Sequence, residues 1–426
     1  MDRIGIFIHE YGLGNSPTLM NSGYVLAEMG FVIDYFISKT FVGDQVFSHP
    51  RITIHQIDEK HDESDSSIGS CVKKFIPTPV RNLLGNMYTR STVLKKNILD
   101  KLLCEKRTVE YETLYLKDME RYVHKAVEII GVRNYKLFFG VETGGLIAAA
   151  RIGKERGIPV IYYNLELRLS SEIQTIREGV IKKYEKVSNA SAACTITLDE
   201  ERALLLAEEN GIDLKDILCV PVCADGPRFT DKTDILRKRF NLSRNDKIIL
   251  YAGFLCEWAM TEELARAAFS WPENRVLVLH SHGYHDPGFI KKIKKYEGDK
   301  VKISLDPVSY KELPAFLSSA DIGIALYKNL GKNLTLIRSA SGKLAHYLKS
   351  GLPVITNNYP GMKSLIDAYQ CGECVNSPGD INAAMEAIFK NYEAMRRNTF
   401  MCYEENYMFS KQFEKVVEKI KTFLTV

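Results

Sequence analysis

Three glutamates each follow a short apolar run of the kind that forms a buried parallel strand. They are Glu10, Glu142 and Glu166. The strands of a parallel sheet end at one edge, and ligands bind outside that edge, so the three carboxylates are expected to converge. Converging carboxylates can act as a general base or hold sugar hydroxyls. Each glutamate taken alone is better explained as a helix cap or a solvated loop acid. Three glutamates at corresponding strand ends favour a functional role as much as this ordinary one, and the sequence leaves both interpretations open.

A second group of residues has the order expected of a phosphate site. Ser339, Ser341 and Gly342 precede a helical pattern, so free backbone N–H groups and the positive helix end should face a bound anion. Lys343, in the first turn, would add a point charge. His346 follows on the same face of the helix. The alternative is ordinary serine capping beside a surface lysine, and the pattern favours the phosphate site.

The elements that must position these residues alternate between strands and helices in two successive units. In the first unit, strands are expected at Arg3–Ile8, Phe31–Ile37, Ile52–Ile57, Leu137–Val141, Pro159–Tyr163, Cys194–Leu198 and Ile217–Val222. In the second unit they are expected at Lys247–Tyr251, Arg275–Leu279, Val301–Leu305, Asp321–Leu326 and Pro353–Thr356. This alternation predicts an α/β fold of two Rossmann-like domains that face a cleft, each with a parallel sheet covered on both faces.

The domain boundaries follow from the places where this pattern lapses. Turn residues begin at Asp225, which assigns residues 1–225 to an N-terminal domain and residues 226–408 to a C-terminal domain. The last amphipathic stretch, Phe409–Leu424, has apolar residues at helical spacing. It is long enough to cross back, so residues 409–426 are predicted to complete the first domain.

Length and composition exclude several classes of protein. A chain of 426 residues is too long for one core, and 45% apolar with 26% charged residues is ordinary for a globular protein. The 57 basic and 53 acidic residues give a net charge of +4, too small for a dedicated nucleic-acid binder. The chain shows no apolar signal segment and no stretch of ~18 apolar residues. With nine scattered cysteines, these features predict a cytoplasmic protein with reduced thiols.

Two clusters contain possible metal ligands, yet neither has the spacing of a known metal site. Cys371-Gly-Glu-Cys374 has no second CxxC to complete a zinc site, and is expected to lie in a loop. His280-Ser-His282-Gly-Tyr-His285-Asp286 matches no standard zinc motif. The sequence therefore predicts no metal at either cluster.

One insert interrupts the alternation of strands and helices. Residues 72–107 carry nine basic residues against Asp100 and Glu105, interleaved with apolar ones. A basic amphipathic insert can lie on an anionic membrane face. A solvated helical flap explains the same charges equally well.

Two stretches of the second unit carry a family resemblance. They are Ala320-Asp-Ile-Gly-Ile-Ala-Leu-Tyr327 and Ser341-Gly-Lys-Leu-Ala-His-Tyr-Leu-Lys-Ser-Gly-Leu-Pro-Val-Ile355. Both resemble group 1 glycosyltransferases of the GT-B fold, in the family-4 class of retaining enzymes. The resemblance extends to Tyr251-Ala-Gly253 and to the terminal crossover helix, and covers the first unit only loosely.

The resemblance implies a division of labour between the domains. The second domain would hold a nucleotide diphosphate sugar as donor, and the first would hold a glycan or lipid-linked acceptor. The residues expected on the donor side are Gly253, Phe254, Arg338, Ser339, Ser341, Gly342, Lys343 and His346. Those expected in an acceptor-side loop are Gly12, Gly14 and Asn15. No metal or cofactor is implied, because helix ends and basic side chains neutralise the diphosphate in such enzymes.

The sequence departs from the family where a basic pair usually meets the diphosphate. These positions read Phe254 and, one turn further, Ala259. The family's paired glutamates would fall near Arg338 and His346, and neither is acidic. We therefore expect the positive charge at the phosphates to come from Arg338 and Lys343.

The resemblance implies a metal-independent, retaining glycosyltransferase of the hexosyltransferase class in surface polysaccharide or glycoconjugate biosynthesis. Glu166, Glu142 and Glu10 are the expected catalytic or sugar-binding carboxylates. The missing family residues leave two alternatives open. One is a non-catalytic GT-B subunit that activates a partner, and the other is a sugar-nucleotide epimerase.

Overall fold

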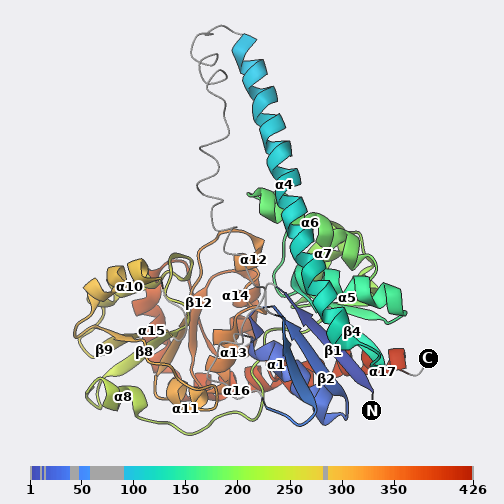
Figure 1. The fold of residues 1–426 in the computed structure, drawn as a ribbon. Coiled ribbons are helices and arrows are strands. Elements are labelled where there is room, and N and C mark those ends of the chain that lie inside the picture. The colour runs from blue at the N-terminus through green and yellow to red at the C-terminus, as the bar shows by residue number, and fades with distance from the viewer. Residues whose placement is uncertain are drawn as a thin grey trace.

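The computed structural model describes residues 2–9, 12–13, 16–38, 48–57, 91–281 and 286–424, with side chains of the first long helix from Glu105 onward. Within these ranges the chain forms two parallel sheets, one in each of two lobes (Figure 1). The expected α/β fold of two Rossmann-like domains is confirmed.

The first sheet has seven strands in the order β3-β2-β1-β4-β5-β6-β7. Their bounds are β1 Arg3–Ile8, β2 Val32–Ile37, β3 Ile52–Gln56, β4 Tyr135–Val141, β5 Val160–Tyr163, β6 Cys194–Thr197 and β7 Ile217–Cys219. All seven strands predicted from the sequence are present. The strand order reverses between β1 and β4, which makes that point of the sheet's carboxyl edge the place where a ligand is expected.

The second sheet has six strands in the order β10-β9-β8-β11-β12-β13. Their bounds are β8 Lys247–Ala252, β9 Arg275–His280, β10 Val301–Ser304, β11 Ile322–Ala325, β12 Val354–Asn357 and β13 Gly372–Val375. The five predicted strands are present, and the order reverses between β8 and β11. The loop predicted around Cys371 and Cys374 is wrong, because β13 forms there as a four-residue edge strand with only its ends buried.

Helices cover both faces of each sheet. Those on the first domain are α1 Pro17–Glu28, α4 Ser91–Ile130, α5 Glu142–Arg156, α6 Ile176–Asn189, α7 Glu200–Asn210 and α17 Phe409–Leu424. Those on the second are α8 Ile235–Arg239, α9 Thr261–Ala267, α10 Pro287–Ile293, α11 Leu313–Ser318, α12 Lys332–Thr335, α13 Gly342–Lys349, α14 Pro360–Tyr369, α15 Ile381–Lys390 and α16 Tyr392–Asn406.

The alternating side chains of β1 show how the first sheet is sandwiched. Ile4, Ile6 and Ile8 point into a core shared with α1 and α17. Phe7 points to the other face, where it packs with α4, α5 and α6. Because side chains alternate along a strand, a run that is apolar at every position must be covered on both faces.

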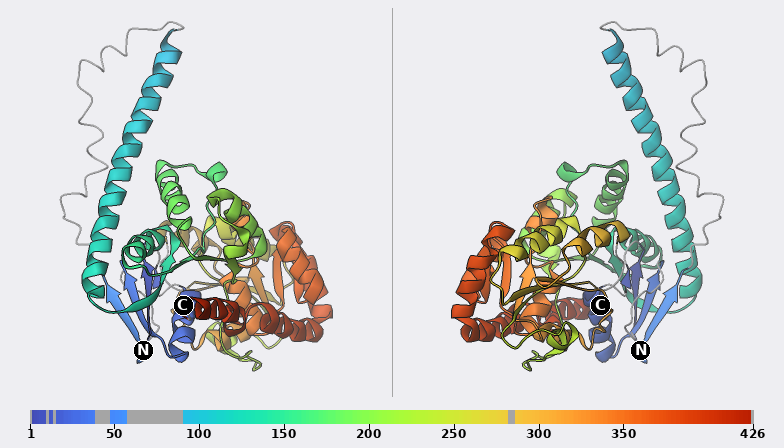
Figure 2. Two further views of the ribbon diagram at one scale, coloured as in Figure 1. Left: turned by 90° about the vertical axis from the view of Figure 1, so that its right-hand side faces the viewer. Right: turned by 90° about the vertical axis from the view of Figure 1, so that its left-hand side faces the viewer.

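Helix α4 is 40 residues long, about 60 Å at 1.5 Å per residue. From Tyr115 onward it packs on the first domain. Its earlier part projects from the body of the protein (Figures 1 and 2). Val109 and Leu114 are exposed on that part. Most of the insert predicted at residues 72–107 lies outside the described residues.

The two domains are joined by two neighbouring crossings of the chain. Ala224 and Met408 form an isolated parallel bridge, and the Phe409 amide donates to the Ala224 carbonyl at 2.9 Å. Helix α17 then runs back under the first domain, beside the N-terminus (Figure 2). Phe409 and Phe413 are fully buried in the first domain's core. The predicted crossover helix is confirmed.

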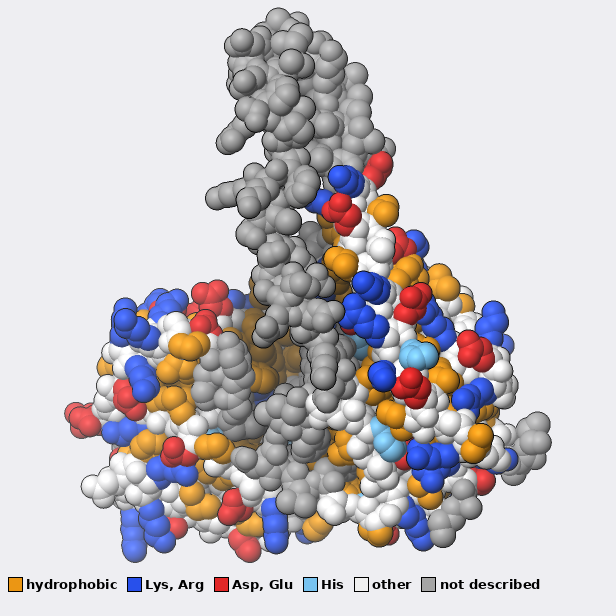
Figure 3. Space-filling model, in the orientation of Figure 1, with side chains coloured by type: hydrophobic (Ala, Val, Ile, Leu, Met, Phe, Trp, Pro, Cys, Tyr) orange, Lys and Arg blue, Asp and Glu red, His pale blue; other side chains and the backbone are white. Residues whose placement is uncertain are grey.

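The surface carries charges of both signs. On the face in Figure 3, basic and acidic side chains are interspersed over both domains rather than gathered in one patch. Among the described residues, no helix is both long and apolar enough to cross a membrane.

Candidate functional site

Lys343 lies where the strand order of the second sheet reverses, between β8 and β11. Its ammonium Nζ is 3.0 Å from the hydroxyl of Tyr251, at the end of β8. It lies 4.3 Å from the ring centroid of Tyr251 and 4.6 Å from that of Tyr327, which follows β11. The ring of Trp258, stacked on Tyr327, is 5.8 Å away. We call these three rings the aromatic cage of Lys343.

The cage takes the Lys343 side chain out of water without pairing it with a carboxylate. Burial lowers the pKa of Lys343 to about 7. In the part of the chain that the structure describes, no carboxylate lies within ion-pair distance of Nζ. A cation that faces aromatic rings and has no counter-ion can accept an anionic ligand without first breaking an ion pair.

Helix α13 begins beside this cage. The side chain of Ser341 caps the helix by accepting from the Leu344 amide at 3.2 Å, and its Oγ lies 2.6 Å from the Tyr327 hydroxyl. The amides of Gly342 and Lys343 open the first turn, where backbone N–H groups have no partner within the helix. The helix end and the ammonium therefore present positive charge at the same place.

Two neighbouring residues fix the position of this helix start. A Cβ added at Gly253, just after β8, would lie 3.2 Å from Lys343 Cε and would crowd the lysine side chain. The carbonyl of Ser339 accepts from the Val222 amide at 2.7 Å. Because Val222 belongs to the crossing between the domains, α13 starts at their junction. Phe254 is half exposed beside the cage.

Glu142 lies at the carboxyl end of β4, as predicted, but its carboxylate is fully engaged. Oε1 accepts from the amides of Leu165 and Glu166 at 2.7 and 3.0 Å, and Oε2 accepts from Arg168 at 2.9 Å. Its side chain is 2% exposed. Its backbone has φ of 52°, a left-handed conformation that non-glycine residues rarely adopt. Strain of this kind is kept where surrounding bonds over-determine it, and here they hold the loop after β5.

Glu166 lies in that loop, at the contact between the two domains. Its Oε2 accepts a hydrogen bond from the side chain of Asn333, on α12 of the second domain. Burial, followed by the neighbouring Glu142 charge, raises the pKa of Glu166. A carboxyl group with a raised pKa at a domain junction suits proton transfer or stabilisation of a developing positive charge.

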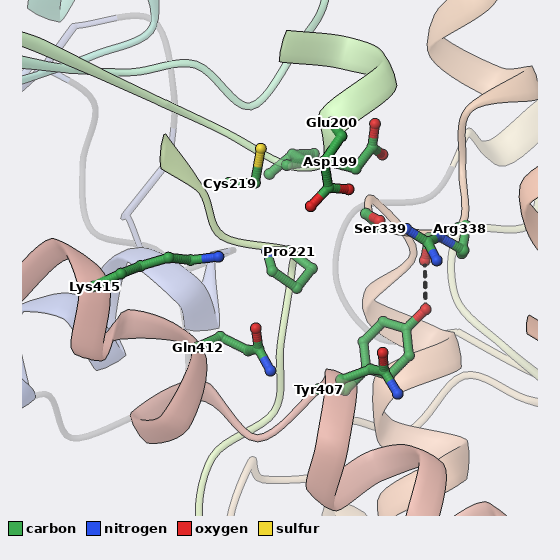
Figure 4. Close-up of a pocket in the computed structure, with 11 residues that line it drawn as sticks. Asp199, Glu200, Cys219, Pro221, Arg338, Ser339, Tyr407, Gln412 and Lys415 are labelled. Carbon is green, nitrogen blue, oxygen red and sulfur yellow. Dashed lines mark hydrogen bonds between the residues drawn. The ribbon is translucent and has the colours of Figure 1, made fainter. Parts of the chain in front are cut away.

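Arg338 does not join Lys343 in the cage. It lines a separate pocket of about 90 Å³ at the domain junction, with Asp199 and Glu200 at the start of α7 and Lys415 from α17 (Figure 4). Ser339 lines the same pocket.

The remaining predicted residues are placed as follows. His346, on α13, packs edge-on against Tyr310 with ring centroids 5.4 Å apart. Gly12 precedes Leu13, which is buried in the first core. Three predicted residues lie outside the described ranges, namely Glu10, Gly14 and Asn15.

No metal site is formed by the residues in view. Within the described ranges, no three His, Cys, Asp or Glu side chains form a group that could hold a metal ion. His280 contacts the Ser304 hydroxyl at 3.0 Å through Nδ1 and packs on Phe316. The rest of the predicted histidine cluster, residues 282–285, lies outside those ranges.

Several site residues were not singled out from the sequence. Trp258 and Tyr327 line the cage, Asn333 and Arg202 join the domains, and Arg168 pairs with Glu142. The rings come from separate loops, so no spacing links them. Arg202 alone had a visible anomaly, as an arginine on the apolar side of a helical pattern.

Comparison with known proteins places this geometry in context. Residues 292–408, which include α13 and Lys343, match the family described as "Glucosyltransferase 3-like, C-terminal domain". No curated protein matches the chain in sequence.

Solved structures match the fold along the whole chain. Sucrose-phosphate synthase from Thermosynechococcus elongatus is 14% identical with a TM-score of 0.70, and the match covers 100% of both chains. HepE of Anabaena, solved with UDP-glucose, is 10% identical with a TM-score of 0.67, covering 99% of this chain and 100% of its own. MnaA of S. aureus, solved with UDP, is 10% identical with a TM-score of 0.57, covering 100% and 97%.

These likenesses confirm the resemblance seen in the sequence. The chain has the GT-B fold, in a divergent form. Its second domain is similar, over residues 292–408, to the C-terminal domain of glucosyltransferase 3-like proteins.

Proposed function

We propose that this protein is a glycosyltransferase that moves a sugar from a nucleotide diphosphate sugar to an acceptor. The observation that carries the proposal is the Lys343 ammonium, caged by aromatic rings at the start of α13 and without a carboxylate partner among the described residues. This site lies at the switch point of a GT-B second domain, where a donor diphosphate is expected. The complexes of HepE with UDP-glucose and of MnaA with UDP support a nucleotide sugar as ligand.

In the proposed mechanism, the second domain supplies charge to the leaving group. The diphosphate accepts hydrogen bonds from the Gly342 and Lys343 amides and faces the Lys343 ammonium. As the bond from the sugar to the diphosphate breaks, negative charge grows on the phosphate oxygen, and these fixed donors stabilise it. Because the positive charge of Lys343 and of the helix start faces the diphosphate, we propose that the reaction needs no metal ion.

The first domain would complete the reaction at the sugar. Glu166 would face the positive charge that develops on the sugar ring, and the acceptor would lie near Gly12, Gly14, Asn15 and Glu10. Glu142 would serve by holding the loop of Glu166. We propose retention of configuration on the strength of the family resemblance.

The acceptor is proposed to be a glycan or a lipid-linked molecule, used in making surface polysaccharide or a glycoconjugate. Residues 72–107 would bring the enzyme to the cytoplasmic face of an anionic membrane. The projecting part of α4 supports a contact away from the body of the protein.

Thermal unfolding with a panel of nucleotide sugars, nucleoside diphosphates and nucleosides tests the donor site. A ligand at 100 times its Kd adds about 2.7 kcal/mol of stability. We expect stabilisation by a diphosphate and by one nucleotide sugar, but little by the nucleoside. No binding at millimolar diphosphate would favour a non-catalytic subunit. Turnover of the nucleotide sugar without acceptor would favour an epimerase.

The Glu166→Gln variant tests the reaction step. It keeps the shape of the side chain and removes its charge, so turnover should fall by on the order of 10²–10⁴ while donor affinity changes little. Full activity in this variant would remove Glu166 from the reaction. A loss of donor affinity alone would move it to the binding site.

A further inference from the structure

Asn333 of the second domain is bound on three sides by the first domain. Its side-chain Nδ2 donates to the Glu166 carboxylate. Its Oδ1 accepts from the Leu167 amide at 3.2 Å and from Arg202 Nη1 at 2.8 Å. One amide side chain thus binds the carboxylate of Glu166 and the backbone next to it.

Arg202 is the anchor of this contact. Its side chain is 0% exposed, although an arginine carries five donors that all need acceptors. Nη2 donates to the carbonyl of Asn333 at 2.8 Å, and Nε and Nη2 each lie 3.2 Å from the carbonyl of Leu336. A first-domain guanidinium is therefore satisfied by the backbone of the second domain.

The segment that carries Asn333 connects the two halves of the site. It runs from the end of β11, beside Tyr327, to Ser341 and Lys343 at the start of α13. On the opposite side, Glu142 holds the amides of Leu165 and Glu166. Asn333 therefore fixes the distance between Glu166 and Lys343 at the start of α13.

We propose that Asn333, anchored by Arg202, is a positioning residue that fixes the Glu166 carboxylate against the donor when the two domains are closed. The inference rests on the proposed role of Glu166. If the domains separate, the hydrogen bonds that Asn333 and Arg202 make across the junction break. Glu166 then loses the hydrogen bond that it accepts from Asn333. The reactive arrangement then exists only in the closed protein.

Charged groups around Glu166 determine what the loss of Asn333 does. The charge of Glu142 disfavours the ionised form of Glu166. The charges of Arg168 and Arg202 favour that ionised form, and so does the hydrogen bond from Asn333. Removing that hydrogen bond therefore raises the pKa of Glu166. The limb of the pH–rate profile that belongs to Glu166 moves to higher pH, whether Glu166 acts as a base or as an acid.

The test compares Asn333→Ala and Asn333→Asp in the full-length protein. We expect kcat at neutral pH to fall by roughly 10- to 100-fold, as for a misplaced catalytic group. In the alanine variant, the midpoint of the Glu166 limb should move to higher pH by about one unit. A shift of this size corresponds to the loss of one hydrogen bond to a charged group. The midpoint should rise further in the aspartate variant, because two adjacent carboxylates do not ionise together. Asn245→Ala, at an exposed turn of the same domain, is the control.

The aspartate variant keeps the acceptor for Leu167 and Arg202, so it separates positioning from folding. Thermal unfolding of all variants is measured alongside. If kcat and the melting temperature both fall while the pH of the Glu166 limb stays the same, the inference is overturned. Asn333 would then have only a structural role. Arg202→Lys, which loses the guanidinium fork, should give a partial shift in the same direction.

This outcome is distinguishable from a failure of the proposed function. If Glu166→Gln retains full activity, the role proposed for Glu166 is wrong and the inference falls with it. If Glu166→Gln is inactive while the limb stays fixed in both Asn333 variants, only the positioning inference is overturned.

Discussion

Lys343 and Tyr251, 92 residues apart in sequence, meet with the ammonium 3.0 Å from the phenol hydroxyl. The phenol is a neutral partner, so it orients the ammonium and leaves its charge available. Tyr251 donates its own hydrogen bond to the Phe254 carbonyl at 2.7 Å, which fixes the hydroxyl as an acceptor for Lys343. Lys343 and Tyr251 are thus held in place at the start of α13 without any ligand.

Replacement of Lys343 by alanine should weaken binding of a nucleoside diphosphate. A charge-assisted bond contributes about 2–3 kcal/mol, so the loss should be roughly 30- to 150-fold. The parent nucleoside, which has no phosphate, should bind almost as before. Calorimetry with both ligands measures the two effects, and equal losses for both would show that Lys343 supports the fold instead.

Arg338→Gln is the matched comparison. Because Arg338 lines the pocket at the domain junction rather than the cage, we expect a loss of less than about threefold, which corresponds to about 0.7 kcal/mol. A loss as large as that of Lys343→Ala would return Arg338 to the phosphates, as the sequence suggested.

Donor binding should depend on pH through Lys343. Its pKa of about 7 in the free protein means that the ammonium is charged below pH 7 and increasingly neutral above it. A bound diphosphate favours the charged form and raises this pKa, so binding above pH 7 takes up a proton. Affinity for a nucleotide sugar should be constant on the acid side and fall up to tenfold per unit as the pH rises above about 7. Lys343→Arg, which stays charged, should abolish the dependence.

Glu142→Gln should act on stability and on the pose of Glu166 rather than on donor binding. The change removes a buried charge that Arg168 and two backbone amides share. A hydrogen bond to a charged group contributes about 1.5–3 kcal/mol, so we expect a loss of unfolding free energy of this order. Denaturant unfolding measures it. Unchanged stability with lost turnover would instead place the Glu142 carboxylate in contact with the substrate.

Charge reversal in the insert should abolish binding to anionic liposomes. The variant exchanges Lys73, Lys74, Lys95 and Lys96 for glutamate, and each basic residue near such a surface contributes roughly 1 kcal/mol. Four reversals at exposed lysines of the second domain serve as the control, namely Lys291, Lys294, Lys295 and Lys311. Equal co-sedimentation of both variants at low salt would end the membrane proposal.

The fold was largely predictable from the sequence because each buried parallel strand appears as a short run of apolar residues. A strand such as Arg3–Ile8, covered on both faces, is apolar along its length, and a pattern of this kind needs no knowledge of its neighbours. The edge strand Gly372–Val375 has two half-exposed positions and lacks such a run. The helix start at Lys343 was also visible, since Ser339, Ser341 and Gly342 lie within the four residues before it.

The contacts that complete the site were not predictable in the same way. Asn333 meets Glu166 across 167 residues of sequence and Arg202 across 131. The rings around Lys343 follow from the order of strands in the sheet, which brings the ends of β8 and β11 together. Such pairings depend on topology, and no spacing along the chain records them.

The position of α17 has a consequence for how the protein is made. Phe409, Phe413, Val416 and Ile420 are fully buried in the first domain's core, yet they are synthesised only after the whole second domain. The entire second domain is translated between the two parts of that core. A nascent chain can therefore fold its second domain first, while one face of the first domain's sheet stays uncovered until α17 has left the ribosome.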